Sequence, residues 1–150
     1  MRVIALGNPM ACDDGAAMEA ARRLPSREGV EVVLAGRPGP SLLDLLDPDV
    51  PTVLVDVVRL GATSGTIVEL ALADLASASI DGKPISSHGF GAAQALELAE
   101  ALARPLPRGI FLGFGGRELG PGTTLSPEVA IALDDLVTAL EAAVDALLEG

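Results

Sequence analysis

Three side chains of this 150-residue sequence have residue types that suit metal chemistry. Asp14 follows Asp13 in an acidic pair, Asp56 interrupts the apolar run at 52–58, and His88 is the only histidine. A carboxylate buried unpaired among β-branched residues is costly, so Asp56 needs a backbone donor, a metal or a strand-end position. Two carboxylates and an imidazole together suit a borderline divalent ion such as nickel or zinc.

Each of these residues also has an ordinary explanation. An aspartate before a helix is most often a cap, and Asp13-Asp14 precedes an Ala-rich helical stretch. A lone histidine near the start of a helix is usually structural or exposed. Spacing alone therefore leaves open whether Asp14, Asp56 and His88 come together.

Other chemistries have weaker support in the sequence. It contains no Walker-type loop, no Gly-x-Gly-x-x-Gly after the first strand and no Gly-x-Ser-x-Gly elbow. Cys12 is the only cysteine, and carboxylates beside it would raise rather than lower the pKa of a thiol, so we expect a packed core thiol. The glycine-rich stretch at 113–122 is interpreted as a flexible surface loop.

The elements that must position these residues alternate along the chain. Apolar periodicity and breaker residues predict strands at 2–6, 30–35, 52–58, 65–70 and 108–114, the fourth an antiparallel edge strand. Helices are predicted after Asp14 up to Leu24, at 41–46, at about 92–103 and from 127 to the end, with Ser126 as a cap. The segment 73–84 is expected to be an irregular connection. This order predicts a single domain over 1–150, a three-layer α/β/α sandwich with a mostly parallel sheet of about five strands.

The predicted fold gives a reason for the candidate residues to meet. Open α/β sheets bind ligands at the carboxyl ends of their strands. Asp14 follows the first strand, Asp56 lies near the end of the third, and His88 begins a helix after a Ser-Ser turn. We therefore expect a site at this edge of the sheet.

Composition narrows the choice of partner. The formal net charge is −11, which repels nucleic acid and anionic lipid, and aromatic residues make up 2% of the chain. No apolar run has the length of a signal peptide core or a transmembrane helix. We expect a soluble cytoplasmic protein that binds neither nucleic acid nor membrane.

Five motifs in the same order resemble those of the hydrogenase maturation endopeptidases, over nearly the whole chain. They are Gly7-Asn8-Pro9 with Asp13-Asp14-Gly15, Val53-Leu54-Val55-Asp56, Gly65-Thr66, Ser86-Ser87-His88-Gly89 with Leu96, and Leu125-Ser126-Pro127-Glu128-Val129.

The resemblance implies an activity and a site. Members of this family are endopeptidases that remove a C-terminal extension from the precursor of a nickel-iron hydrogenase large subunit after nickel insertion. The metal-contacting residues of the family fall on Asp14, Asp56 and His88, which would also be the catalytic set. The implied cofactor is nickel, supplied by the substrate, and the implied partner is one precursor acted on by a monomer.

The sequence departs from the family in its loops. Where members often carry Gly-Gly-Thr followed by Gly after the second strand, this chain has Ala35-Gly36-Arg37-Pro38-Gly39. A second glycine after the acidic pair is replaced by Ala16-Ala17, and 115–118 also differs. These changes indicate a divergent subgroup with its own precursor.

Two other functions are compatible with the residues. One is a non-catalytic relative that binds a partner and senses its nickel state without cutting it. The other is a small α/β domain that binds a phosphorylated metabolite at the Gly7-Asn8 or Gly115-Gly116 loop, which the nearby acidic pair disfavours.

Overall fold

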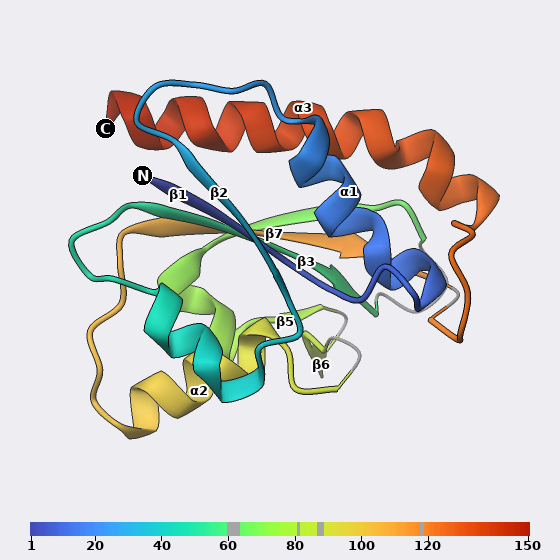
Figure 1. Ribbon diagram of the computed structural model, residues 1–150. Coiled ribbons are helices and arrows are strands. Elements are labelled where there is room, and N and C mark those ends of the chain that lie inside the picture. The colour runs from blue at the N-terminus through green and yellow to red at the C-terminus, as the bar shows by residue number, and fades with distance from the viewer. Residues whose placement is uncertain (60–63, 81, 87–88, 118) are drawn as a thin grey trace.

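The computed structural model describes residues 1–59, 64–80, 82–86, 89–117 and 119–150. A five-stranded sheet lies at its centre, in the order β2-β1-β3-β7-β4 (Figure 1). The parallel strands are β1 (Arg2–Leu6), β2 (Glu31–Gly36), β3 (Thr52–Val58) and β7 (Gly109–Gly115). Strand β4 (Ile67–Ala71) runs antiparallel to β7 at one edge. The predicted mostly parallel sheet and its antiparallel edge strand are confirmed.

Helices connect these strands. The α-helices are α1 (Ala16–Arg23), α2 (Ala92–Ala101) and α3 (Pro127–Glu149), and the 3-10 helices are η1 (Cys12–Gly15), η2 (Gly39–Leu45) and η3 (Leu72–Ser77). The segment 73–84, expected to be irregular, instead contains most of η3 and a short hairpin of β5 (Ser79–Ile80) and β6 (Lys83–Pro84). Elements this short show no clear apolar period in the sequence.

The helices form layers on the two faces of the sheet (Figure 1). Successive side chains of a strand point to opposite faces. Val3 and Ala5 accordingly join a core with α1 and α3, while Ile4 and Leu6 join a second core with α2, η2 and η3. Every residue of β3 is buried, as predicted for a strand covered on both faces. The three-layer α/β/α architecture is confirmed.

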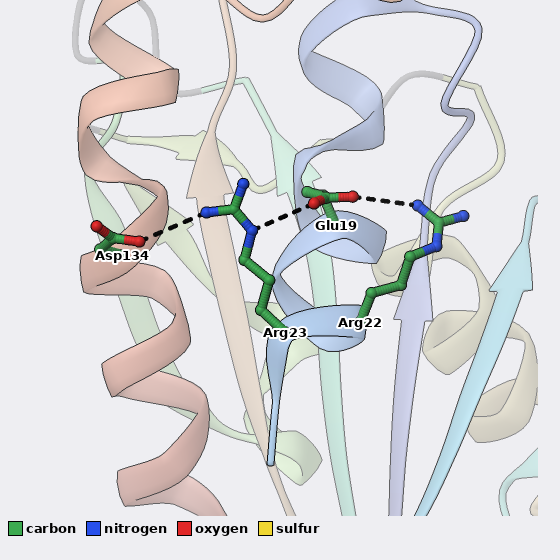
Figure 2. Close-up of polar contacts among 4 residues, drawn as sticks. All are labelled: Glu19, Arg22, Arg23 and Asp134. Carbon is green, nitrogen blue, oxygen red and sulfur yellow. Dashed lines mark hydrogen bonds and ion pairs between the residues drawn. The ribbon is translucent and has the colours of Figure 1, made fainter. Parts of the chain in front are cut away.

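An exposed ion-pair network links α1 to α3 (Figure 2). Arg23 lies 3.2 Å from Glu19 on its own helix and 3.5 Å from Asp134 on α3, and Arg22 lies 3.5 Å from Glu19. Exposed pairs of this kind contribute little to stability because water and salt screen them. The apolar faces below them hold the two helices together.

The strand order creates a switch point between β1 and β3. From β1 the chain passes to β2, which pairs with one edge of β1, and then returns to β3, which pairs with the other edge of β1. Pairing of β1 with β3 extends to Ala5 and Val55, and β3 then continues through Asp56. Ligands of open α/β sheets bind at such a point.

No helix in the described part of the chain has the length and apolar composition needed to cross a bilayer.

Candidate active site

Asp14 and Asp56 line one small pocket at the switch point. The pocket has an empty volume of about 220 Å³ and is lined by Leu6, Gly7, Asp14, Gly36, Arg37, Pro38, Asp56, Phe90 and Gly91. Asp14 is 1% exposed and Asp56 is 3% exposed. Two almost fully buried carboxylates that lie 42 positions apart in the sequence therefore line one recess where three parallel strands end.

One oxygen of Asp14 receives several donors. Oδ2 accepts the backbone N–H of Asn8 at 2.8 Å and Nε of Arg37 at 3.0 Å, and Nη2 of Arg37 also lies at 3.0 Å. The other oxygen, Oδ1, accepts no hydrogen bond from the part of the chain that the structure describes. Asp14 is thus held through Oδ2 by the loop after β1, through Asn8, and by the loop after β2, through Arg37.

Gly7 brings the loop after β1 against Asp14. Its φ is +129°, and a Cβ atom at this position would lie 1.9 Å from the backbone oxygen of Asp14. No other residue fits there, because glycine alone combines this backbone conformation with the absence of a Cβ. The N–H of Gly7 donates to the carbonyl of Gly36 at 2.8 Å, which ties the loops after β1 and β2 together. The Gly-Asn-Pro signature thereby places Asp14.

Asp56 is presented by the central strand. It pairs in register with Gly113 of β7, and β3 continues for two residues beyond it to Val58. Its neighbours Val55 and Val57 point to the face of α1 and α3, so Asp56 points to the opposite face. Its burial agrees with the position inside the apolar run.

Asp13 has a different role from its neighbour. It accepts the N–H and the hydroxyl of Ser126 at 2.6 and 2.7 Å and the N–H of Arg117 at 2.9 Å. Neither aspartate caps α1, whose N-cap is Gly15 with no side-chain hydrogen bond, so the capping explanation is wrong. Ser126 occupies the N-cap position of α3, but its hydroxyl bonds Asp13 and does not cap the helix.

The glycine-rich loop is fastened to the loop after β1. Gly122 donates to the carbonyl of Met10 at 2.8 Å and accepts the N–H of Cys12 at 2.9 Å. The expected flexible surface loop is therefore wrong: these bonds, and the bond from Arg117 to Asp13, attach the segment to the residues around the site. Cys12 is buried with its sulfur 3.7 Å from the carbonyl of Pro121, which confirms a packed thiol.

His88 lies outside the described residues, so its predicted meeting with the two aspartates stays a prediction. On one side of it, Ser86 accepts the N–H of Arg59, which follows β3, at 2.9 Å. On the other side, a Cβ atom on Gly89 would lie 3.8 Å from Nη1 of Arg37, and Gly91 lines the pocket. Among the described residues, no three His, Cys, Asp or Glu side chains are grouped to hold a metal ion.

Sequence reasoning missed two pocket residues, Arg37 and Phe90. Arg37 pairs with Asp14, and Phe90 is 43% exposed at the pocket. The sequence did mark Arg37 as unusual, because it stands in the loop after the second strand where members of the family often carry Gly-Gly-Thr followed by Gly. Nothing local indicated its partner, which lies 23 positions away.

Comparisons with known proteins agree on one family. The model of the HycI hydrogenase maturation protease family matches residues 16–143, and no curated protein matches the sequence. The solved hydrogenase maturating endopeptidase HybD from E. coli is 20% identical with a TM-score of 0.75, covering 96% of this chain and 91% of that one. The [NiFe] hydrogenase maturation protease HybD from Thermococcus kodakarensis is 26% identical with a TM-score of 0.69, covering 94% and 96%. HycI from the same organism is 16% identical with a TM-score of 0.66, covering 96% and 91%.

The first and third of these likenesses establish the fold, and the family match extends over most of the sequence, including Asp56 and His88. The chain belongs to the hydrogenase maturation protease family, the endopeptidases that cleave the C-terminus of the large subunit of nickel-iron hydrogenases.

Proposed function

We propose that this protein removes the C-terminal extension of one hydrogenase large-subunit precursor after nickel insertion, with Asp14, Asp56 and His88 contacting that nickel. The observation that carries the proposal is the pair of buried carboxylates, Asp14 and Asp56, in one pocket at the switch point. We further propose that it acts as a monomer in the cytoplasm. Light scattering tests the oligomeric state.

The three residue types fit the metal. Carboxylate oxygens and an imidazole nitrogen are suitable ligands for nickel. Because the nickel arrives with the precursor, the protease needs only a few contacts to it. Such contacts would hold the adjacent scissile peptide bond at the mouth of the pocket and align it for attack.

Hydrolysis then requires water to add across the peptide bond. The hydroxyl goes to the carbonyl carbon, and a proton goes to the leaving nitrogen. Either a carboxylate base or the metal can activate the water, and the developing oxyanion needs a positive neighbour such as the nickel. Asp14 and Asp56 are the described carboxylates that line the pocket and can take the proton.

The alternatives have less support. Because the chain belongs to a family of endopeptidases, a non-catalytic sensor of nickel has less support than a protease. Two buried carboxylates in the pocket would repel a phosphorylated metabolite there.

The test is cleavage of a nickel-loaded precursor, followed by mass spectrometry. Asp14→Asn, Asp56→Asn and His88→Ala should each slow cleavage by at least about 100-fold, as expected when a group that transfers a proton or positions substrate is lost. Asp134→Asn is the matched control, because its side chain is 90% exposed on α3 (Figure 2). Circular dichroism should show the same fold in all variants. Normal cleavage by Asp14→Asn and His88→Ala would sink the proposal.

A further inference from the structure

A guanidinium group already occupies one side of the Asp14 carboxylate. Nε and Nη2 of Arg37 both lie 3.0 Å from Oδ2, the oxygen that also accepts the Asn8 N–H. The Asp14 side chain is 2% exposed and that of Arg37 is 36% exposed. The pair therefore joins a buried carboxylate to a guanidinium whose side chain is partly exposed at the mouth of the pocket.

Arg37 is the only cationic residue among the described residues that line the pocket. It offsets part of the negative charge of Asp14 and Asp56. Since charges interact more strongly where water is excluded, this offset matters more here than it would on the surface. It also means that the resting pocket already has a counter-ion.

A divalent ion on Oδ1 of Asp14 would be separated from the guanidinium by a single carboxylate group. The two like charges would repel each other, and a free aquated ion carries its full charge into that interaction. To avoid the repulsion, Arg37 would have to leave Asp14 and lose the hydrogen bond from Nε and the ion-pair contact of Nη2. Either route weakens binding of free metal.

We propose that Arg37 is a specificity-determining residue that keeps free divalent metal off Asp14, so that the pocket accepts nickel only when the precursor's own ligands hold it. Ligands on the precursor reduce the effective charge of the nickel, and the contacts of the precursor with the protease compensate for the remaining repulsion. Such a device is useful because a carboxylate-imidazole site has little intrinsic selectivity among first-row metals. The inference rests on the proposed function of Asp14.

The experiment measures binding of free Ni²⁺ by calorimetry, with no precursor present. Arg37→Gln should bind Ni²⁺ at least tenfold more tightly than the unaltered protein. Arg37→Lys keeps the charge and should remain weak. Arg22→Gln is the control: it removes the same charge from a residue whose described ion pair is with Glu19 on α1 (Figure 2). The affinity of this variant for Ni²⁺ should equal that of the unaltered protein. If Arg37→Gln does not fold, Arg37→Met, which keeps the apolar stem without the charge, replaces it.

A double variant locates the effect. Adding Asp14→Asn to Arg37→Gln should abolish the gain in affinity. Equal affinity of Arg37→Gln and the unaltered protein would overturn the inference, and so would a gain that persists in the double variant. Failure of the proposed function itself would appear separately, as normal precursor cleavage by Asp14→Asn in an assay without free metal.

Discussion

Asp13 accepts both the backbone N–H and the hydroxyl of Ser126, at 2.6 and 2.7 Å, across 113 positions of sequence. The two residues join the loop after β1 to the start of α3. Asp14 is the next residue along the chain, so this contact helps to fix the position of the carboxylate that lines the pocket. The two adjacent aspartates thus have different roles: Asp13 binds the start of α3, and Asp14 lines the pocket.

Asp13→Ala should therefore reduce stability. It removes the acceptor of the partly buried N–H groups of Ser126 and Arg117, and hydrogen bonds to a charged group contribute about 1.5–3 kcal/mol each. We expect a loss of about 3 kcal/mol in the free energy of unfolding, measured by urea denaturation. Asp14→Asn should change it far less, because its partner Arg37 reaches solvent. Equal losses in the two variants would contradict this division of roles.

Gly7→Ala should disrupt both folding and cleavage. Its Cβ would overlap the backbone oxygen of Asp14, and neither backbone can move without shifting the pocket. Gly29→Ala is a matched control, since Gly29 also has a positive φ but no atom within 4 Å of its Cβ position. The control should lose only about 1–2 kcal/mol, the cost of a left-handed residue. Thermal melting and precursor cleavage measure the difference, and similar losses would argue against a close-packing role for Gly7.

Phe90→Ala should weaken precursor binding. The ring is 43% exposed at the edge of the pocket, where it can pack against an apolar part of the precursor. We expect KM to rise by about fivefold to tenfold, corresponding to about 1–1.4 kcal/mol of buried apolar contact, with kcat nearly unchanged. Leu102→Ala, which truncates a 58% exposed side chain at the end of α2, should leave both constants unchanged. A fall in kcat alone would place Phe90 in the chemical step instead.

Nickel in the precursor should be required for cleavage. If Asp14, Asp56 and His88 read the metal, a precursor prepared without nickel offers them nothing to bind, and mass spectrometry should show it uncut. The nickel-loaded precursor should be cut under the same conditions. Efficient cleavage of the nickel-free precursor would show that these residues act without the metal.

Much of the fold could be read from local patterns. The run at 52–58 becomes β3 with the predicted bounds, because a continuous β-branched stretch can satisfy its burial only between two helical layers. The final helix begins at Pro127 as expected, since proline fixes the backbone of the first turn. The hairpin of β5 and β6 escaped prediction because two-residue strands have no period to detect.

The sequence by itself determined the five strands of the central sheet and the three α-helices in their chain order, the family, and the aspartates that reach the switch point. These follow from periodicity, motif order and the rule that parallel strands end at a common edge. Only the tertiary structure decided which partner each aspartate takes. Asp13 bonds Ser126 and Asp14 bonds Arg37 because chain crossings bring distant loops together, and no local spacing encodes which donors a buried carboxylate will meet.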